Sequence, residues 1–66
     1  MKTKEAAVSI IESKLKLTGT ARVARIHGAL QLAGFQIGSL DMTARLCMTL
    51  GYRVFKEADN TLMVTH

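Results

Sequence analysis

The stretch SLDMTARLCMTLGYRV, residues 39–54, decides the fold because it joins two kinds of secondary structure. Ser39 is a favourable N-cap for a helix over Leu40–Leu50, and Gly51 is a typical residue to end that helix. Asp41 lies in the first turn, where the helix dipole favours a negative charge. After Gly51 the side chains alternate with a period of two, which indicates a strand. The stretch therefore predicts a helix that leads directly into a β-hairpin.

A second β-prone run, Thr61–Thr65, completes the hairpin. Asp59 and Asn60 separate the two runs. Both residue types tolerate positive φ, so we expect a two-residue hairpin turn at this pair.

Two further helices are predicted upstream, over Lys4–Leu17 and Ala21–Ala33, from apolar residues that recur with the helical period. Thr20 is placed to cap the second helix at its start, and Gly34 to end it in a left-handed conformation. Gly28 lies inside this helix, where glycine costs about 1 kcal/mol relative to alanine. We therefore expect a neighbouring helix to approach Gly28 closely.

The predicted fold class is α+β and mostly α: three helices followed by a C-terminal two-stranded β-hairpin, in a single domain over residues 1–66. A chain of 66 residues buries only about 60% of the surface that it exposes when unfolded, so its stability is marginal. Its single cysteine, Cys47, excludes an intramolecular disulfide. Tight packing or association must therefore supply the stability, and we expect a homodimer.

The first predicted helix carries more apolar residues than one buried face requires. A strip of Ala6, Ile10 and Leu17 lies beside the main stripe and indicates a partner surface. Glu12 and Lys16, on the polar side, are expected to be solvated and to form a favourable i,i+4 pair.

The order of elements resembles a winged helix-turn-helix domain, and the stretch over residues 39–54 carries the resemblance. A capped helix that ends in Leu-Gly-Tyr-x-Val and enters a strand is similar to that superfamily's junction between recognition helix and wing. The resemblance implies that the third helix enters the major groove of DNA and that the wing contacts its backbone or minor groove. The strand that many members place between the first two helices has no counterpart in this pattern.

The net charge of +4 agrees with binding to double-stranded DNA, because cations release counterions from phosphates. By position, the resemblance implies contacts from the third helix and the wing. The second helix and the hairpin turn add basic and amide groups within reach of phosphates. The candidate DNA-binding residues are Arg22, Arg25, Asp41, Arg45, Thr49, Arg53, Lys56 and Asn60. The function predicted is a small transcriptional regulator or accessory factor, and the short chain is typical of phage or plasmid genes.

Met42 and Met48 on the third helix leave an alternative open. Recognition helices usually carry several polar or basic groups, and this helix has one cation. Methionines in these positions fit a wide core stripe, but they also fit a protein-contact patch. The alternative function is therefore a protein-binding module, an inhibitor or assembly factor that docks through Met42 and Met48 or through the Ile10–Leu17 strip.

Other chemistry finds little support in the sequence. His27 and His66 have no second ligand at metal-binding spacing, so His27 is expected to be solvated and His66 to fray. Cys47 falls on the core side of the third helix and is expected to be an inert buried thiol. No glycine motif for phosphate or dinucleotide binding is present, so neither an enzyme nor a cofactor is predicted. The absence of a long apolar run and the lone thiol predict a cytoplasmic protein without a membrane segment.

Overall fold

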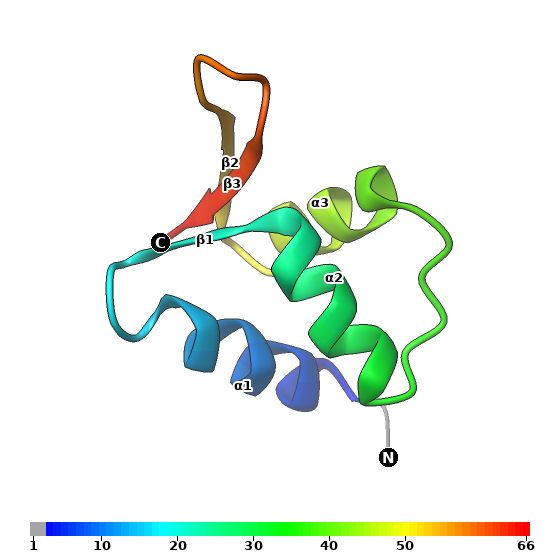
Figure 1. Cartoon of the computed structure of the whole chain (residues 1–66). Coiled ribbons are helices and arrows are strands. Elements are labelled where there is room, and N and C mark those ends of the chain that lie inside the picture. Colours follow the sequence, from blue (N-terminus) through cyan, green and yellow to red (C-terminus); the bar gives the residue numbers. More distant parts are fainter. Residues whose placement is uncertain (1–2) are drawn as a thin grey trace.

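The computed structural model describes residues 3–66 as three helices and a three-stranded antiparallel sheet (Figure 1). The β2–β3 hairpin projects away from the helices in this view. The elements in chain order are α1 (Lys4–Leu15), β1 (Thr20–Arg22), α2 (Val23–Leu32), α3 (Leu40–Thr49), β2 (Arg53–Lys56) and β3 (Leu62–Thr65). The predicted mostly-α, α+β class is confirmed. The predicted count of two strands is wrong, because a third strand lies between the first two helices.

The last strand, β3, occupies the centre of the sheet, which has the order β1-β3-β2. Val64 is opposite Ala21 of β1 on one side and Val54 of β2 on the other, and its side chain is fully buried. Thr20 is therefore part of a strand and does not cap α2. The N-cap is Arg22, whose side chain makes no capping hydrogen bond. Three residues are too few to show the two-residue period of a strand in the sequence. β1 forms because β3, far along the chain, pairs with it.

The ends of the helices follow local sequence signals. Ser39 caps α3 as predicted, since its hydroxyl accepts a hydrogen bond from the backbone N–H of Met42 at 3.2 Å. Gly34 and Gly51 both have positive φ, 93° and 96°. After α3, Gly51 N–H donates to Met48 O and Tyr52 N–H to Cys47 O, both at 3.0 Å. This pair of bonds satisfies carbonyls that the helix end would otherwise leave open.

Three local predictions are corrected. α1 ends at Leu15 and not at Leu17. After this end, Gly19 has a φ of 79° and its N–H donates a hydrogen bond to Leu15 O at 2.8 Å. A Cβ added at Gly28 would meet nothing within 4 Å, so no close helix approach explains that glycine. The hairpin loop has three residues, 58–60: Asn60 N–H donates to Glu57 O, and the left-handed residue is Asn60. A type I turn followed by a left-handed residue is a common hairpin solution.

The core lies between the three helices and one face of the sheet. It contains a buried threonine, Thr43, whose Oγ1 lies 2.7 Å from Nδ1 of His27. His27 is thus half-buried at the contact of α2 with α3, and the expectation of a solvated ring is wrong. Leu40, at the start of α3, is 43% exposed, whereas Thr43 is fully buried. The fully buried large side chains are Ile11, Leu15, Ile26, Leu30, Val23, Val64, Thr43 and Cys47.

A polar cluster joins the C-terminus to α1. Tyr52 donates a hydrogen bond to Oε2 of Glu12 at 2.5 Å, and Nε2 of His66 lies 3.0 Å from the same oxygen. Glu12 thus pairs with residues far along the chain rather than with Lys16, and His66 is held by this cluster rather than frayed. The hydrogen bond from Tyr52 lowers the pKa of Glu12, and His66 contributes to the same effect. Burial, followed by the bond to Glu12, raises the pKa of Tyr52 to about 12.

A pair of glycine substitutions tests the account of the helix ends. Gly51→Ala should destabilise the protein by about 1–2 kcal/mol, because alanine is strained at positive φ even though nothing lies within 4 Å of the added Cβ. Gly28→Ala, in the interior of α2, should stabilise it by up to about 1 kcal/mol. Urea unfolding followed by circular dichroism measures both. Equal effects of the two substitutions would contradict the assignment of Gly51 as a left-handed helix end.

The polar cluster predicts how stability changes at alkaline pH. The folded state holds the Tyr52 proton up to a pKa of about 12, whereas an unfolded tyrosine loses it near pH 10, at roughly the model-compound pKa. Stability should therefore be fully present below about pH 10 and fall as the pH rises toward 12. The chain has one tyrosine and no tryptophan, so the ultraviolet absorbance of tyrosinate reports Tyr52 alone.

Glu12→Gln is the matched variant for this titration. It removes the negative charge beside the Tyr52 hydroxyl and should lower the midpoint of the absorbance change. A midpoint that is the same in both proteins would show that Glu12 does not act on Tyr52.

Candidate nucleic-acid interface

The sheet has two faces, and its register assigns each strand residue to one of them. Side chains that are opposite each other on neighbouring antiparallel strands point to the same face, and the faces alternate along each strand. The inner face carries the row Ala21–Val64–Val54, which is packed on the core. Lys56, two residues beyond Val54, points to this same side of the hairpin. The outer face carries the rows Arg22–Met63–Phe55 and Thr20–Thr65–Arg53.

Helix α3 turns a mixed polar and apolar face to solvent. Met42 and Met48 are each 52% exposed, so these methionines do not belong to the core stripe. Arg45 lies between them on the helix surface and is exposed. Thr49 is exposed too, but its hydroxyl donates to the carbonyl of Arg45 at 2.9 Å. That hydroxyl therefore offers an outside group mainly its acceptor lone pairs.

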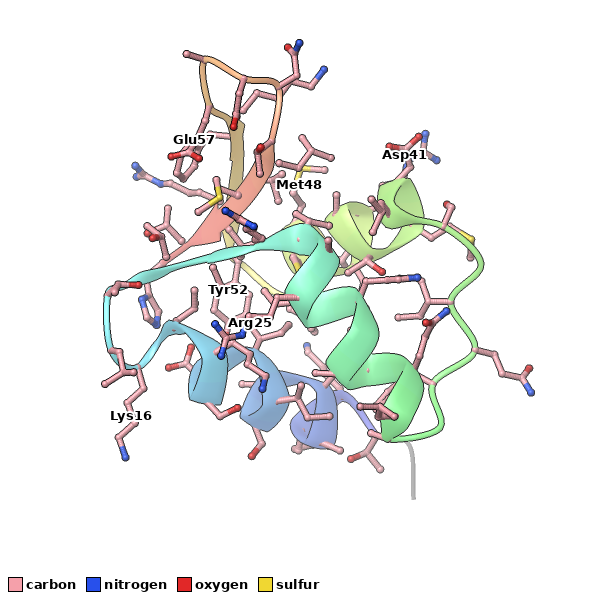
Figure 2. The ribbon with its side chains drawn as sticks, viewed as in Figure 1. Lys16, Arg25, Asp41, Met48, Tyr52 and Glu57 are labelled. Atoms are coloured by element: carbon pink, nitrogen blue, oxygen red, sulfur yellow. The ribbon has the colours of Figure 1, made fainter. Side chains whose placement is uncertain are left out.

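The exposed face of α3 and the hairpin lie next to each other. Figure 2 shows Met48 between α3 and the hairpin, and Asp41 at the other end of the helix. Lys56 projects from the hairpin on the side of the sheet that packs toward the core and α3. Asn60 is exposed at the hairpin tip. We call this region the α3–wing surface; its residues are Asp41, Met42, Arg45, Met48, Thr49, Lys56 and Asn60.

The other predicted DNA-binding residues lie elsewhere. Arg22 and Arg53 are on the outer face of the sheet, away from Lys56. Arg25 lies toward α1 in Figure 2, where it lines a groove together with Lys14. The structure thus divides the eight predicted residues between two surfaces. The sequence had no signal for this division, because it depends on the register of β1 against β3.

The cations of the α3–wing surface are free to meet a ligand. Over residues 3–66 the one ion pair within 4 Å joins His66 to Glu12, so Arg45 and Lys56 have no carboxylate at that distance. At the hairpin tip, Asp59 Oδ1 accepts a hydrogen bond from Thr61 N–H at 3.0 Å. Hydrogen bonding with Thr61 lowers the pKa of Asp59, and the charge of Arg22 adds to the effect. Asp59 is thus held in place at the hairpin tip by Thr61, and no ion pair within 4 Å joins it to Arg22.

The predicted strip of Ala6, Ile10 and Leu17 is not one continuous surface. Ile10 packs partly against the core and Ala6 is half-buried. Leu17 lies beyond the end of α1 and is 95% exposed. Of the three, Leu17 alone is fully presented to solvent.

Comparison with family models, with curated proteins and with solved structures finds no match for this chain. Within residues 3–66, no group of three histidine, cysteine or acidic side chains is placed to hold a metal ion. None of the helices described in this range has the length and apolar character needed to cross a membrane.

Proposed function

We propose that this protein is a small winged helix-turn-helix protein that binds double-stranded DNA, as a transcriptional regulator or accessory factor. The observation that carries the proposal is the order α1-β1-α2-α3-β2-β3 with β3 at the centre of the sheet. This is the order of elements in winged helix-turn-helix domains, including the strand between the first two helices that the sequence pattern lacks. In such an arrangement α3 is the recognition helix and the β2–β3 hairpin is the wing.

The α3–wing surface offers groups suited to both kinds of DNA contact. Arg45, central on the exposed face of α3, is suited to donate two hydrogen bonds to the edge of a guanine in the major groove. Asp41, in the first turn of α3, is suited to accept from the amino group of a cytosine. Lys56 and Asn60 on the wing supply phosphate contacts, which fix orientation without reading sequence.

A DNA-bound α3 also accounts for its exposed methionines. Apolar side chains in the major groove contact the methyl group of thymine. Met42 and Met48 flank Arg45 and would lie against the same groove. Their exposure supports a second candidate as well, a protein-binding module that docks through these two methionines, since adaptable methionine surfaces are common at interfaces.

The proposal includes a homodimer, because a second copy would double the phosphate contacts and set the spacing between two half-sites. Its interface is not the continuous Ala6–Ile10–Leu17 strip, since Ile10 is engaged with the core. Leu32 at the end of α2, 93% exposed, is an apolar side chain available for such a contact.

Fluorescence anisotropy with a random-sequence DNA duplex at two salt concentrations tests the proposal. We expect measurable binding at low salt with a steep loss of affinity as salt increases. Arg45→Ala and Lys56→Ala should each weaken binding and reduce the slope of log affinity against log salt by roughly one. Lys16→Ala is the matched control, since Lys16 lies far from α3 and the hairpin in Figure 2 and its loss changes the net charge equally.

Two outcomes would count against the DNA proposal. Absence of binding at low salt would favour the protein-binding alternative. Equal losses in all three variants would mean that the duplex responds to net charge and not to the α3–wing surface.

A further inference from the structure

A second surface, on the far side of α2 from α3, combines apolar side chains with unpaired cations. A groove of about 660 Å³ runs between the end of α1, strand β1 and the start of α2. The side chains that matter for its chemistry are Lys14, Leu17, Arg22, Arg25 and Met63. We call it the cationic groove. It shares no residue with the α3–wing surface.

The apolar part of the groove is unusual for a surface. Leu17, in the turn after α1, has 95% of its area in contact with water. Met63 lies on the outer face of the sheet and extends the apolar area toward Phe55, its cross-strand neighbour, which is 40% exposed. Leu17 and Met63 line the same groove, and apolar side chains that lie together on a surface mark an interaction site more often than scattered single residues do.

The rim of the groove is positive. Lys14, Arg22 and Arg25 line it, and no acidic residue does. Over residues 3–66 none of these three cations has a carboxylate within 4 Å. Asp59 on the hairpin is the acid whose pKa responds to Arg22, and it lies outside the groove. An occupant that matches this surface therefore has an apolar centre and negative charges at its sides.

The backbone around the groove favours a helix over an added strand. β1 is an edge strand, and a peptide strand would have to pair with its free backbone groups. The hydroxyl of Thr18 donates to the carbonyl of Thr20 at 2.8 Å and also receives the N–H of Thr20 at 3.4 Å. The edge is thus partly occupied by the chain itself, as protected edges are. A helix needs no such backbone groups, because it docks through its side chains.

We propose that the cationic groove binds an acidic amphipathic helix of a partner protein. The apolar stripe of that helix packs on Leu17 and Met63, and its carboxylates pair with Lys14, Arg22 and Arg25. A DNA backbone fits the groove less well, because its phosphates would satisfy the rim but leave the apolar centre without a partner. The inference does not rest on DNA binding by α3, since the two surfaces have no residue in common. Together they would allow the protein to hold DNA on one side and a second protein on the other.

A designed peptide serves as the probe. It is a fluorescent, alanine-based helix with leucines at i, i+3, i+4 and i+7 and glutamates on both flanks of that stripe; its control has every glutamate replaced by glutamine. Arg25→Glu should weaken binding of the acidic peptide at least about tenfold, as should replacement of the glutamates in the peptide. Leu17→Ser should weaken it too, and the exposure of Leu17 means that the fold should tolerate the change. Arg45→Glu, on the α3–wing surface, is the charge-matched control and should alter the affinity less than about twofold.

Three results would overturn the inference. Equal weakening of peptide binding by Arg25→Glu and Arg45→Glu would mean that the peptide responds to the net charge of the protein and not to the groove. Displacement of the peptide by a random DNA duplex, with Arg25→Glu losing DNA affinity as strongly as Arg45→Glu, would make the groove a phosphate-binding site. A dimer in sedimentation that Leu17→Ser dissociates, with no peptide binding, would make the occupant a second copy of this chain. Circular dichroism confirms that each variant is folded before it is scored.

Discussion

The pairing of β3 with two strands at once is the interaction on which the rest of this structure depends. Val64 is packed between Ala21 and Val54, and all three side chains face the core. The same strand turns the residues after α1 into β1 and holds the hairpin against the helices. Next to it, Thr65 donates a hydrogen bond to Gly19 O at 2.8 Å, which ties the turn before β1 to the end of the chain. β3 contacts β1, β2, α2 and α3, so this one strand connects most elements of the domain.

The sheet also divides the surface of the protein. One face of the sheet packs on the core. Lys56 lies on this same face, further along the hairpin and toward α3. The opposite face carries Arg22, Met63 and Phe55, and the first two of these line the cationic groove together with Leu17. The net charge alone gives no information on how the cations are distributed over the surface. The register of three short strands places some of them on the α3–wing surface and others on the side of the cationic groove, two surfaces that suit different ligands.

Local signals in the sequence predicted much of the fold. The hydroxyl of Ser39 and the left-handed conformations of Gly34 and Gly51 set helix ends within a few residues, and such signals can be read in one dimension. The missed features all join residues far apart in the chain. β1 forms against β3 near the other end of the chain, and Glu12 contacts Tyr52 and His66, which lie 40 and 54 positions later. Periodicity within a short window carries no information about such partners.

The candidate site was predicted in its parts but not in its arrangement. Arg45 and Lys56 were named from the resemblance to a helix followed by a wing, and they lie on one surface. Arg22 was named from charge and position alone, and it lies on another. The apolar pattern predicts that Leu17 belongs to a strip on the first helix, but α1 ends before it. The placement of a surface residue depends on the exact end of its element, and ends are the least certain part of any sequence-based assignment.

The sheet separates the α3–wing surface, which we propose binds DNA, from the cationic groove. Amide chemical shifts of the labelled protein, followed by nuclear magnetic resonance during titration with a random DNA duplex, test it most directly. Shift changes should concentrate on α3 and the wing, at residues such as Arg45, Thr49 and Lys56. Leu17 and Arg25 should remain close to their positions in the free protein. Changes that are largest around Leu17 and Arg25, with α3 unaffected, would show that DNA binds at the cationic groove and not at α3.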